Sequence, residues 1–237
     1  MPAIDPILDI AGLHTGYGSR EAVFDVSLSV GEGEVVTLVG HNGAGKTTTL
    51  KAAMGLLAVW AGEIRFLDRR ITNSSSAANV RRGLCMLLED DFVFRDLTVA
   101  ENLQLAAFTT ASDRAAEIRR DVFELLPVLA DRRGQRAGTM SGGERRMLSV
   151  GMALMSEARM LLLDEPSLGL APVLVEQVMG LIEQLVAERG LSVLMVEQNV
   201  DQALRIADRA YVLRAGRIVV EEDASALRQR SQWWDLF

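Results

Sequence analysis

The 237-residue chain is 49% hydrophobic, which is enough for a packed core in one large domain or one domain with an insertion. Its formal net charge of −7 argues against broad nucleic-acid binding, which normally needs a basic surface. No apolar run approaches the roughly 18 residues of a membrane-spanning helix, and the acidic start lacks the basic segment of a signal peptide. We therefore expect a cytoplasmic protein that binds no nucleic acid.

Residues 7 to about 88 are expected to form short strands, a glycine-rich loop and the helix that follows this loop. Directly after the apolar run EVVTLV, the pattern G-x-x-x-x-G-K-[ST] is filled by Gly40, Gly45, Lys46 and Thr47. Such loops point backbone N–H groups at phosphate oxygens, and the helix adds its positive dipole end. Lys46 is expected to reach the β- and γ-phosphates of a nucleotide, and Thr47 to bind Mg²⁺. The alternative is a glycine-rich turn that binds nothing.

Residues 89 to about 158 are predicted to be mainly helical. Within them, MSGGERRMLSV places Ser141 and two glycines at the start of an expected helix. A hydroxyl group and free backbone N–H groups at a helix start suit a phosphate, yet no lysine follows. An ordinary helix-capping serine followed by glycines is the other interpretation.

The segment ARMLLLDEPSLGL contains an uninterrupted apolar strand that ends in Asp164 and Glu165. A strand that is apolar on both faces is typical of the centre of a parallel sheet. Ligands of such sheets bind outside the carboxyl edge, so both carboxylates are expected to face Lys46. Asp164 would hold Mg²⁺, directly or through water, and Glu165 would take a proton from the attacking water as general base. The alternative is an exposed acidic strand end.

The rest of the chain alternates strand and helix, which fits a single domain over residues 1–237. We expect a core of residues 1–88 and 159–237, with residues 89–158 as an inserted helical subdomain.

The phosphate loop, MSGGE and LLLDEP, in this order, make the sequence resemble the ATP-binding cassette (ABC) ATPases over nearly the whole chain. The resemblance implies an α/β fold: a P-loop NTPase core with a parallel central sheet, an antiparallel N-terminal β subdomain and an inserted helical subdomain. In this family the Ser-Gly-Gly segment binds the γ-phosphate of ATP held by a second subunit, so that two chains sandwich two nucleotides. A lysine supplied by that subunit explains why none follows Ser141.

The resemblance also assigns contacts to ATP and Mg²⁺. Tyr17 matches the aromatic residue that stacks on adenine, and Glu89 replaces the glutamine that reaches the metal and the membrane subunit. Gln198 replaces a histidine on the γ-phosphate; it can donate a hydrogen bond there but cannot take up a proton at neutral pH, which leaves Glu165 as the only base. The expected catalytic residues are Glu165, Gln198 and Lys46, and the expected metal ligands are Thr47, Glu89 and Asp164. The expected ATP contacts are Tyr17, Gly40, Asn42, Gly43, Ala44, Gly45, Lys46, Thr47, Thr48, Ser141, Gly142 and Gly143.

Within the family, LTVAENL, LLLDEPSLGLAP and VEQNVDQALRIADRAYVL are similar to the ATPase subunits of importers for branched-chain and other hydrophobic amino acids. This resemblance implies a homodimer or heterodimer of ABC ATPase subunits. The dimer would dock on integral-membrane permease subunits at the inner face of the cell membrane, and a separate binding protein would deliver the solute. Two features depart from the subfamily: the segment Leu88 to Asp91, which is acidic here, and Met152 in place of an arginine.

Three other functions remain open from the sequence: a non-transport regulatory ATPase, the cassette of a lipid exporter, and a cassette that binds ATP without turnover. The glutamine of VEQN counts against lipid export. Binding to ribosomes or DNA would indicate the regulatory ATPase, and the identity of a co-purified permease would separate import from lipid export. Steady ATP turnover would exclude a cassette that only binds ATP.

Overall fold

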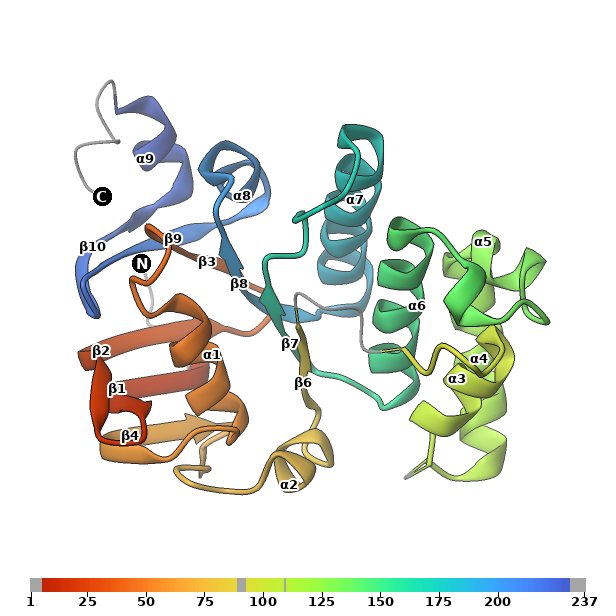
Figure 1. Ribbon diagram of the computed structural model, residues 1–237, viewed down its shortest axis with the longest axis horizontal. Coiled ribbons are helices and arrows are strands. Elements are labelled where there is room, and N and C mark those ends of the chain that lie inside the picture. Colours follow the sequence, from red (N-terminus) through yellow and green to blue (C-terminus); the bar gives the residue numbers. More distant parts are fainter. Residues whose placement is uncertain (1–5, 89–92, 109, 231–237) are drawn as a thin grey trace.

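The computed structural model describes residues 6–88, 93–108 and 110–230, which form two β-sheets with helices around them (Figure 1). The smaller sheet has the strand order β2-β1-β4-β5, and each neighbouring pair is antiparallel. Its strands are β1 (Pro6–Tyr17), β2 (Arg20–Gly31), β4 (Val59–Phe66) and β5 (Arg69–Arg70). This sheet is the expected antiparallel N-terminal unit.

The larger sheet has the strand order β10-β9-β3-β8-β7-β6, and only the β9–β10 pair is antiparallel among the described strands. Its strands are β3 (Val35–Val39), β6 (Leu84–Leu87), β7 (Met160–Asp164), β8 (Ser192–Glu197), β9 (Arg209–Arg214) and β10 (Arg217–Asp223). All residues of β3, β7 and β8 are buried, as the apolar sequence of β7 predicts for a parallel sheet.

The register brings the carboxyl ends of the three central strands to one edge of this sheet. Val39 of β3 lies opposite Glu197 of β8, and Asp164 of β7 lies opposite Val196. The loops after β3, β7 and β8 therefore leave the sheet side by side, which is where open α/β sheets bind ligands.

Helices cover both faces of the larger sheet. They are α1 (Lys46–Met54), α2 (Ser76–Val80), α3 (Val99–Ala106), α4 (Ser112–Leu125), α5 (Pro127–Asp131), α6 (Gly142–Met155), α7 (Pro172–Arg189), α8 (Val200–Ile206) and α9 (Ala224–Gln229), with a 3₁₀ turn at Ala137–Thr139. On one face, Leu161 and Leu163 of β7 pack in a core with α3 to α8; on the other, Leu162 packs in a second core with α1 and the smaller sheet. Burial on both faces removes the most apolar area from water, and this effect dominates the stability of the sheet.

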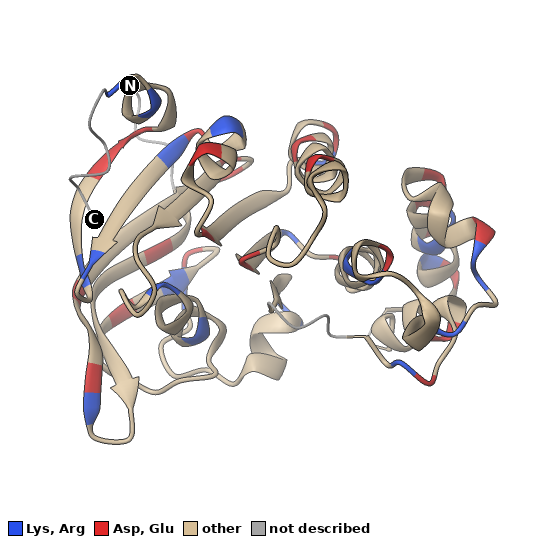
Figure 2. Cartoon of the chain, turned by 45° about the horizontal axis from the view of Figure 1, so that its top comes forward, with Lys and Arg blue, Asp and Glu red and all other residues tan. Residues whose placement is uncertain are grey.

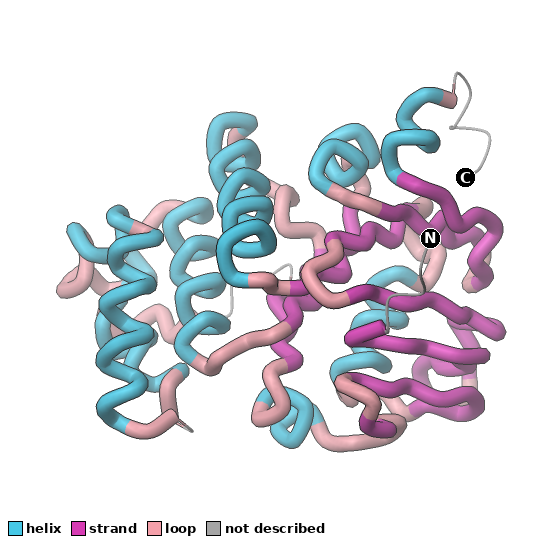
Figure 3. The backbone as a smooth tube through the Cα atoms, turned by 180° about the vertical axis from the view of Figure 1, so that it is seen from behind, coloured by secondary structure: helices cyan, strands magenta, loops and turns pink. Residues whose placement is uncertain are grey.

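Helices α3 to α6 lie together at one end of the molecule, beyond β6 and β7, and the smaller sheet lies at the other end (Figures 1 and 3). Acidic and basic residues are interspersed along these helices and along the strands (Figure 2). Cys85 of β6 is 6% exposed and lies in the core, as its apolar neighbours predict.

The residues with described structure include no helix of sufficient length and hydropathy to span a bilayer. The proposed limits of a helical subdomain at residues 89–158 stay a prediction.

Candidate nucleotide-binding site

The glycine-rich loop joins the end of β3 to the start of α1, in the order that the sequence predicts. Gly45 caps the helix with a φ of 108°, a conformation that an L side chain rarely adopts. A Cβ atom at Gly40 would lie 2.3 Å from the carbonyl oxygen of Leu213. Both glycines are therefore needed for the path of the backbone, which brings the loop close to β9.

Lys46 is folded back into this loop and is only 4% exposed. Its Nζ donates hydrogen bonds to the carbonyl oxygens of Gly40, at 2.8 Å, and His41, at 3.3 Å. Burial lowers the pKa of Lys46, and the nearby charges of Glu165, Asp164 and Glu197 oppose this shift. The ammonium group thus lies beside acidic residues at the carboxyl edge of the sheet.

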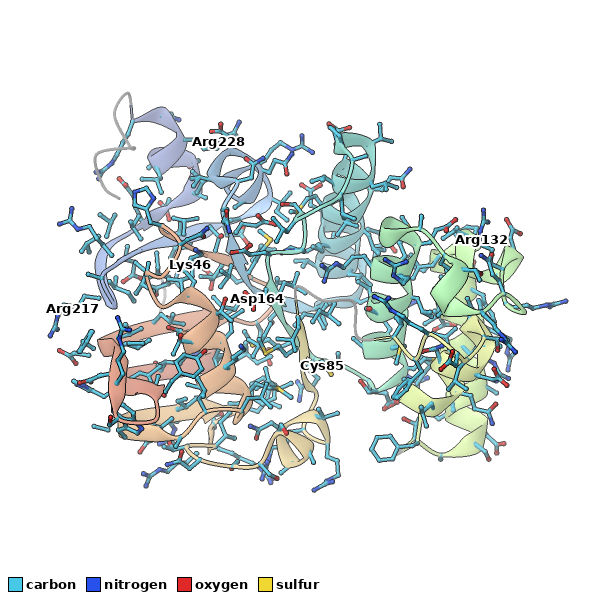
Figure 4. The ribbon with its side chains drawn as sticks, in the orientation of Figure 1. Lys46, Cys85, Arg132, Asp164, Arg217 and Arg228 are labelled. Atoms are coloured by element: carbon cyan, nitrogen blue, oxygen red, sulfur yellow. The ribbon has the colours of Figure 1, made fainter. Side chains whose placement is uncertain are left out.

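Asp164 and Thr47 face one another across this edge. The Thr47 hydroxyl donates to Asp164 Oδ1 at 2.8 Å, and Asp164 is 4% exposed. Burial raises the pKa of Asp164, and the hydrogen bond from Thr47 opposes the increase. Figure 4 shows Lys46 and Asp164 in the middle of the molecule, where α1 approaches β7. Two hard oxygen atoms next to a phosphate loop suit Mg²⁺, which is normally bound by one or two protein oxygens together with phosphates and water.

Glu165 follows Asp164 in an unusual backbone conformation, with a φ of 49°. Its backbone N–H donates to the carbonyl oxygen of Val196 at 2.9 Å, and the residue is buried. Gln198 Nε2 lies 2.9 Å from both carboxylate oxygens of Glu165. The amide of Gln198, which the sequence assigns to the γ-phosphate, thus donates to the carboxylate of Glu165 in this structure.

Lys46, Thr47, Glu165 and Gln198 border an open cavity of about 880 Å³. The predicted residues that line it are Tyr17, Asn42, Gly43, Gly45, Lys46, Thr47, Thr48, Glu165 and Gln198. Tyr17 is 49% exposed at the border of this cavity. Gly40, Ala44 and Asp164 do not line this cavity; Ala44 borders a smaller neighbouring one.

The cavity also includes residues to which the sequence assigned no role at the site, namely Arg20, Glu21, Ala22, Phe24, Leu168 and Ala215. Most of them come from β2 and from the β9–β10 turn. Gly216 in that turn donates its N–H to Ala44 of the phosphate loop at 2.9 Å and accepts from the N–H of Phe24 at 2.8 Å. The turn therefore joins the two sheets at the cavity. In the sequence, only the short separation between Tyr17 and β2 could have indicated that residues of β2 line the cavity.

The Ser141 segment lies elsewhere. Ser141 caps α6: its Oγ accepts from the N–H of Glu144 at 3.3 Å, and the Glu144 carboxylate accepts from the N–H of Ser141 at 2.8 Å. The buried residues of α6 belong to the core on the face of the sheet opposite α1. Ser141, Gly142 and Gly143 do not line the 880 Å³ cavity; Ser141 borders a separate cavity of about 570 Å³ between the α4–α5 junction, α6 and α7. One chain alone thus leaves this segment away from the phosphate loop.

Glu89 and its acidic neighbours Asp90 and Asp91 lie outside the described residues. The expected contact of Glu89 with a metal therefore stays a prediction. In the described part of the chain, no cluster of three or more His, Cys, Asp or Glu side chains could hold a metal ion.

The model of the ABC transporter family matches residues 23–168, a segment that contains the phosphate loop, Ser141 and Glu165. The chain belongs to the ABC transporter family, as one of its ATP-binding ATPases. The expected fold class and the expected ATPase activity are therefore confirmed.

Two relatives and one solved structure illustrate the similarity. The high-affinity branched-chain amino acid transport ATP-binding protein BraG of Pseudomonas aeruginosa is 47% identical, over 93% of this chain and 94% of BraG. The lipopolysaccharide export system ATP-binding protein LptB of Escherichia coli K12 is 36% identical, over 94% of this chain and 92% of LptB. The ADP conformation of the ATP-binding cassette MJ1267 matches with a TM-score of 0.88 at 26% identity, over 98% of each chain.

Proposed function

We propose that the chain is the ATP-hydrolysing subunit of an importer for branched-chain or other hydrophobic amino acids, or a similar small polar solute. The observation that carries the substrate class is the 47% identity to BraG over 93% of the chain, because BraG is by name a branched-chain amino acid transport protein. LptB, named for lipopolysaccharide export, is 36% identical. The higher identity favours amino-acid import over lipid export.

The phosphate loop and Lys46 would bind the phosphates of ATP. The ammonium group lies 2.8 Å from the Gly40 carbonyl oxygen, so it is held within the loop that would bind the phosphates. Thr47 and Asp164 would hold Mg²⁺ through their hydroxyl and carboxylate oxygens, with Glu89 as a further ligand. When bound, the ion would neutralise negative charge on the phosphate oxygens.

Glu165 would act as general base. Water attacks the γ-phosphorus, the bond from this phosphorus to the β–γ bridging oxygen breaks, and the proton of the water passes to the Glu165 carboxylate. The products are ADP and phosphate. The two 2.9 Å contacts of Gln198 Nε2 support a role for this amide in orienting the carboxylate. Because a glutamine takes up no proton near neutral pH, Gln198 would orient Glu165 but Glu165 alone would accept the proton.

A second ABC ATPase subunit, identical or homologous, would complete each site. Ser141, Gly142 and Gly143 border no part of the cavity that holds Lys46 in their own chain. The free N–H groups at the start of α6 nevertheless suit a phosphate. A head-to-tail dimer would place the Ser141 segment of each chain on the nucleotide of the other, in the manner expected from the sequence.

The dimer would associate peripherally with integral-membrane permease subunits on the cytoplasmic side, and indirectly with a solute-binding protein. The helical group α3 to α6, within the proposed insertion at residues 89–158, would supply a surface for the permease. Its exposed apolar side chains include Leu105, 42% exposed, and Phe108, 74% exposed. Contiguous exposed apolar patches mark protein interaction sites, and these side chains would form part of such a patch at the permease.

Replacing Tyr17 with alanine is expected to weaken ATP binding by about tenfold, because stacking on one base contributes about 1–3 kcal/mol. Tyr17→Phe keeps the ring and should bind ATP like the wild type. Affinities for ATP and for inorganic triphosphate, measured by calorimetry, would separate base stacking from phosphate contacts. Equal losses for ATP and triphosphate in Tyr17→Ala would contradict stacking.

The transport function can be tested with the chain, the membrane subunits encoded beside it and their binding protein in proteoliposomes. We expect ATP-dependent uptake of radiolabelled leucine, and none with the Lys46→Ala chain, which lacks the phosphate-binding ammonium. Extraction of lipopolysaccharide without leucine uptake would instead assign the chain to a lipid exporter. Co-purification with ribosomes or DNA, and no association with these membrane subunits, would assign it to a non-transport ATPase.

A further inference from the structure

Glu197, the last residue of β8, is a carboxylate in the interior that none of the roles above uses. It is 1% exposed, and both of its oxygens accept backbone hydrogen bonds. Oε1 accepts from the N–H of Ser167 at 2.8 Å, and Oε2 accepts from the N–H groups of Gln198, at 3.1 Å, and Asn199, at 3.5 Å. Burial raises the pKa of Glu197, and these hydrogen bonds oppose the increase. Burying a carboxylate costs free energy unless its oxygens accept hydrogen bonds. The three backbone N–H groups are therefore what allows Glu197 to be buried at the end of β8.

The Ser167 contact fixes the turn that carries Glu165. Glu165 has a φ of 49°, and such a conformation in a non-glycine residue persists only where the surroundings impose it. In the turn from Glu165 to Leu168, the N–H of Glu165 donates to Val196, and the N–H of Leu168 donates to Glu165 at 3.1 Å. Pro166 has no N–H. Ser167 is therefore the remaining backbone donor of the turn, and Glu197 accepts from it.

The contact with the backbone of Gln198 holds the residue whose side chain bonds to Glu165. Glu197 accepts from the backbone of Gln198, while the Gln198 side chain donates to both oxygens of Glu165. The contacts form a closed ring that runs from Glu165 through its turn to Ser167, then to Glu197, to Gln198 and back to Glu165. A change in any contact of the ring would alter the position of the Glu165 carboxylate.

We propose that Glu197 is a positioning residue for ATP hydrolysis, which holds the turn of Glu165 and the backbone of Gln198 at the spacing needed for proton transfer from water. This inference rests on the proposed role of Glu165 as general base. Glu197 itself does not line the nucleotide cavity, so it acts through the two residues that do.

The test replaces Glu197 with glutamine in the full chain. Glutamine keeps the volume but exchanges one acceptor oxygen for an NH₂ group, which cannot accept from Ser167 or from Gln198. We expect kcat to fall by about 10- to 100-fold, as displacements of about 1 Å in a catalytic group produce, with little change in the KM for ATP. Glu197→Asp keeps both acceptor oxygens on a shorter side chain and should retain an intermediate kcat.

Glu34→Gln is the matched control for a purely structural effect. Glu34 precedes β3 at the end opposite the phosphate loop, where it accepts from the N–H of Gly31 at 2.6 Å and pairs with Arg209 at 2.9 Å. We expect this change to lower the thermal unfolding temperature and to leave kcat unchanged. An unchanged kcat in a folded Glu197→Gln chain would overturn the proposal. So would equal kcat losses in the two variants, because they would show a general effect of lost stability.

A double substitution separates this proposal from the assignment of the base. In a Glu165→Gln chain the carboxylate to be positioned is gone, so adding Glu197→Gln should lower the residual turnover no further. A further loss of the same size as in the wild-type background would overturn the positioning role. If Glu165→Gln alone keeps normal turnover, the assignment of the base fails instead. Should Glu197→Gln not fold, Glu197→Asp takes its place in both backgrounds, and an unchanged kcat of Glu197→Asp in the otherwise wild-type chain would overturn the proposal.

Discussion

Glu165→Gln is expected to bind ATP with nearly wild-type affinity and to hydrolyse it at least roughly 100-fold more slowly, because the substitution removes the proposed general base. The amide has almost the same shape as the carboxylate and can still contact Gln198, which lies 2.9 Å from both oxygens. In the proposed site, Lys46 and the glycine-rich loop would bind the phosphates, and this change does not alter them. Steady-state phosphate release and nucleotide affinity measured on the same preparation would test both parts.

Glu183→Gln provides the control for this experiment. Glu183 is exposed on α7, so the same chemical change there should leave phosphate release unaltered. Near-normal turnover in Glu165→Gln would mean that another group accepts the proton. Equal losses of affinity and turnover would instead mean that Glu165 contributes mainly to binding.

The local parts of the site could be predicted because each is encoded in a short segment. The glycines that the loop needs precede Lys46 directly, and the buried sequence of β7 ends in Asp164 and Glu165. A parallel sheet then brings these segments together, since the carboxyl ends of neighbouring strands lie at one edge. The 2.8 Å contact between Thr47 and Asp164 is the direct result.

The parts built by packing between distant segments could not be predicted. Phe24 and Ala215 reach the cavity because the β9–β10 turn bonds to both β2 and the phosphate loop, and no motif records this pairing. The bond from Gln198 to Glu165 depends equally on two separate loops. Glu197 did leave a signal: SVLMVE, like MLLLD, is an apolar strand that ends in an acid at the carboxyl edge.

Mixing a Lys46→Ala chain with a Ser141→Arg chain is expected to restore ATP hydrolysis that neither chain shows alone. The Lys46→Ala homodimer has a defective phosphate loop in both of its sites. The Ser141→Arg homodimer has a defective Ser141 segment in both of its sites. If Ser141 acts on the nucleotide of the other chain, the mixed dimer has one site with both defects and one intact site. With random exchange at equal amounts, turnover should reach about a quarter of the wild-type value if the two sites act independently.

Ser141 also caps α6, so the arginine variant needs a check of folding. Loss of such a cap costs about 1 kcal/mol, which should lower the unfolding temperature by a few degrees without unfolding the chain. Thermal unfolding and ATP binding of Ser141→Arg before mixing would verify this. Its own phosphate loop should still bind ATP, because Ser141 does not line that cavity.

The reciprocal mixture makes the outcome decisive. A wild-type chain paired with a chain carrying both Lys46→Ala and Ser141→Arg has the same number of defects, arranged differently. If the segment acts across the dimer, each site of this mixed dimer contains one defect and hydrolysis is lost. If it acts within its own chain, the wild-type chain keeps an intact site. Action across the dimer is supported if the first mixture hydrolyses ATP and the mixed dimers of the second do not. It is contradicted if the mixed dimers of the second mixture hydrolyse ATP and the first mixture does not. Two affinity tags would confirm that the chains exchange in both mixtures.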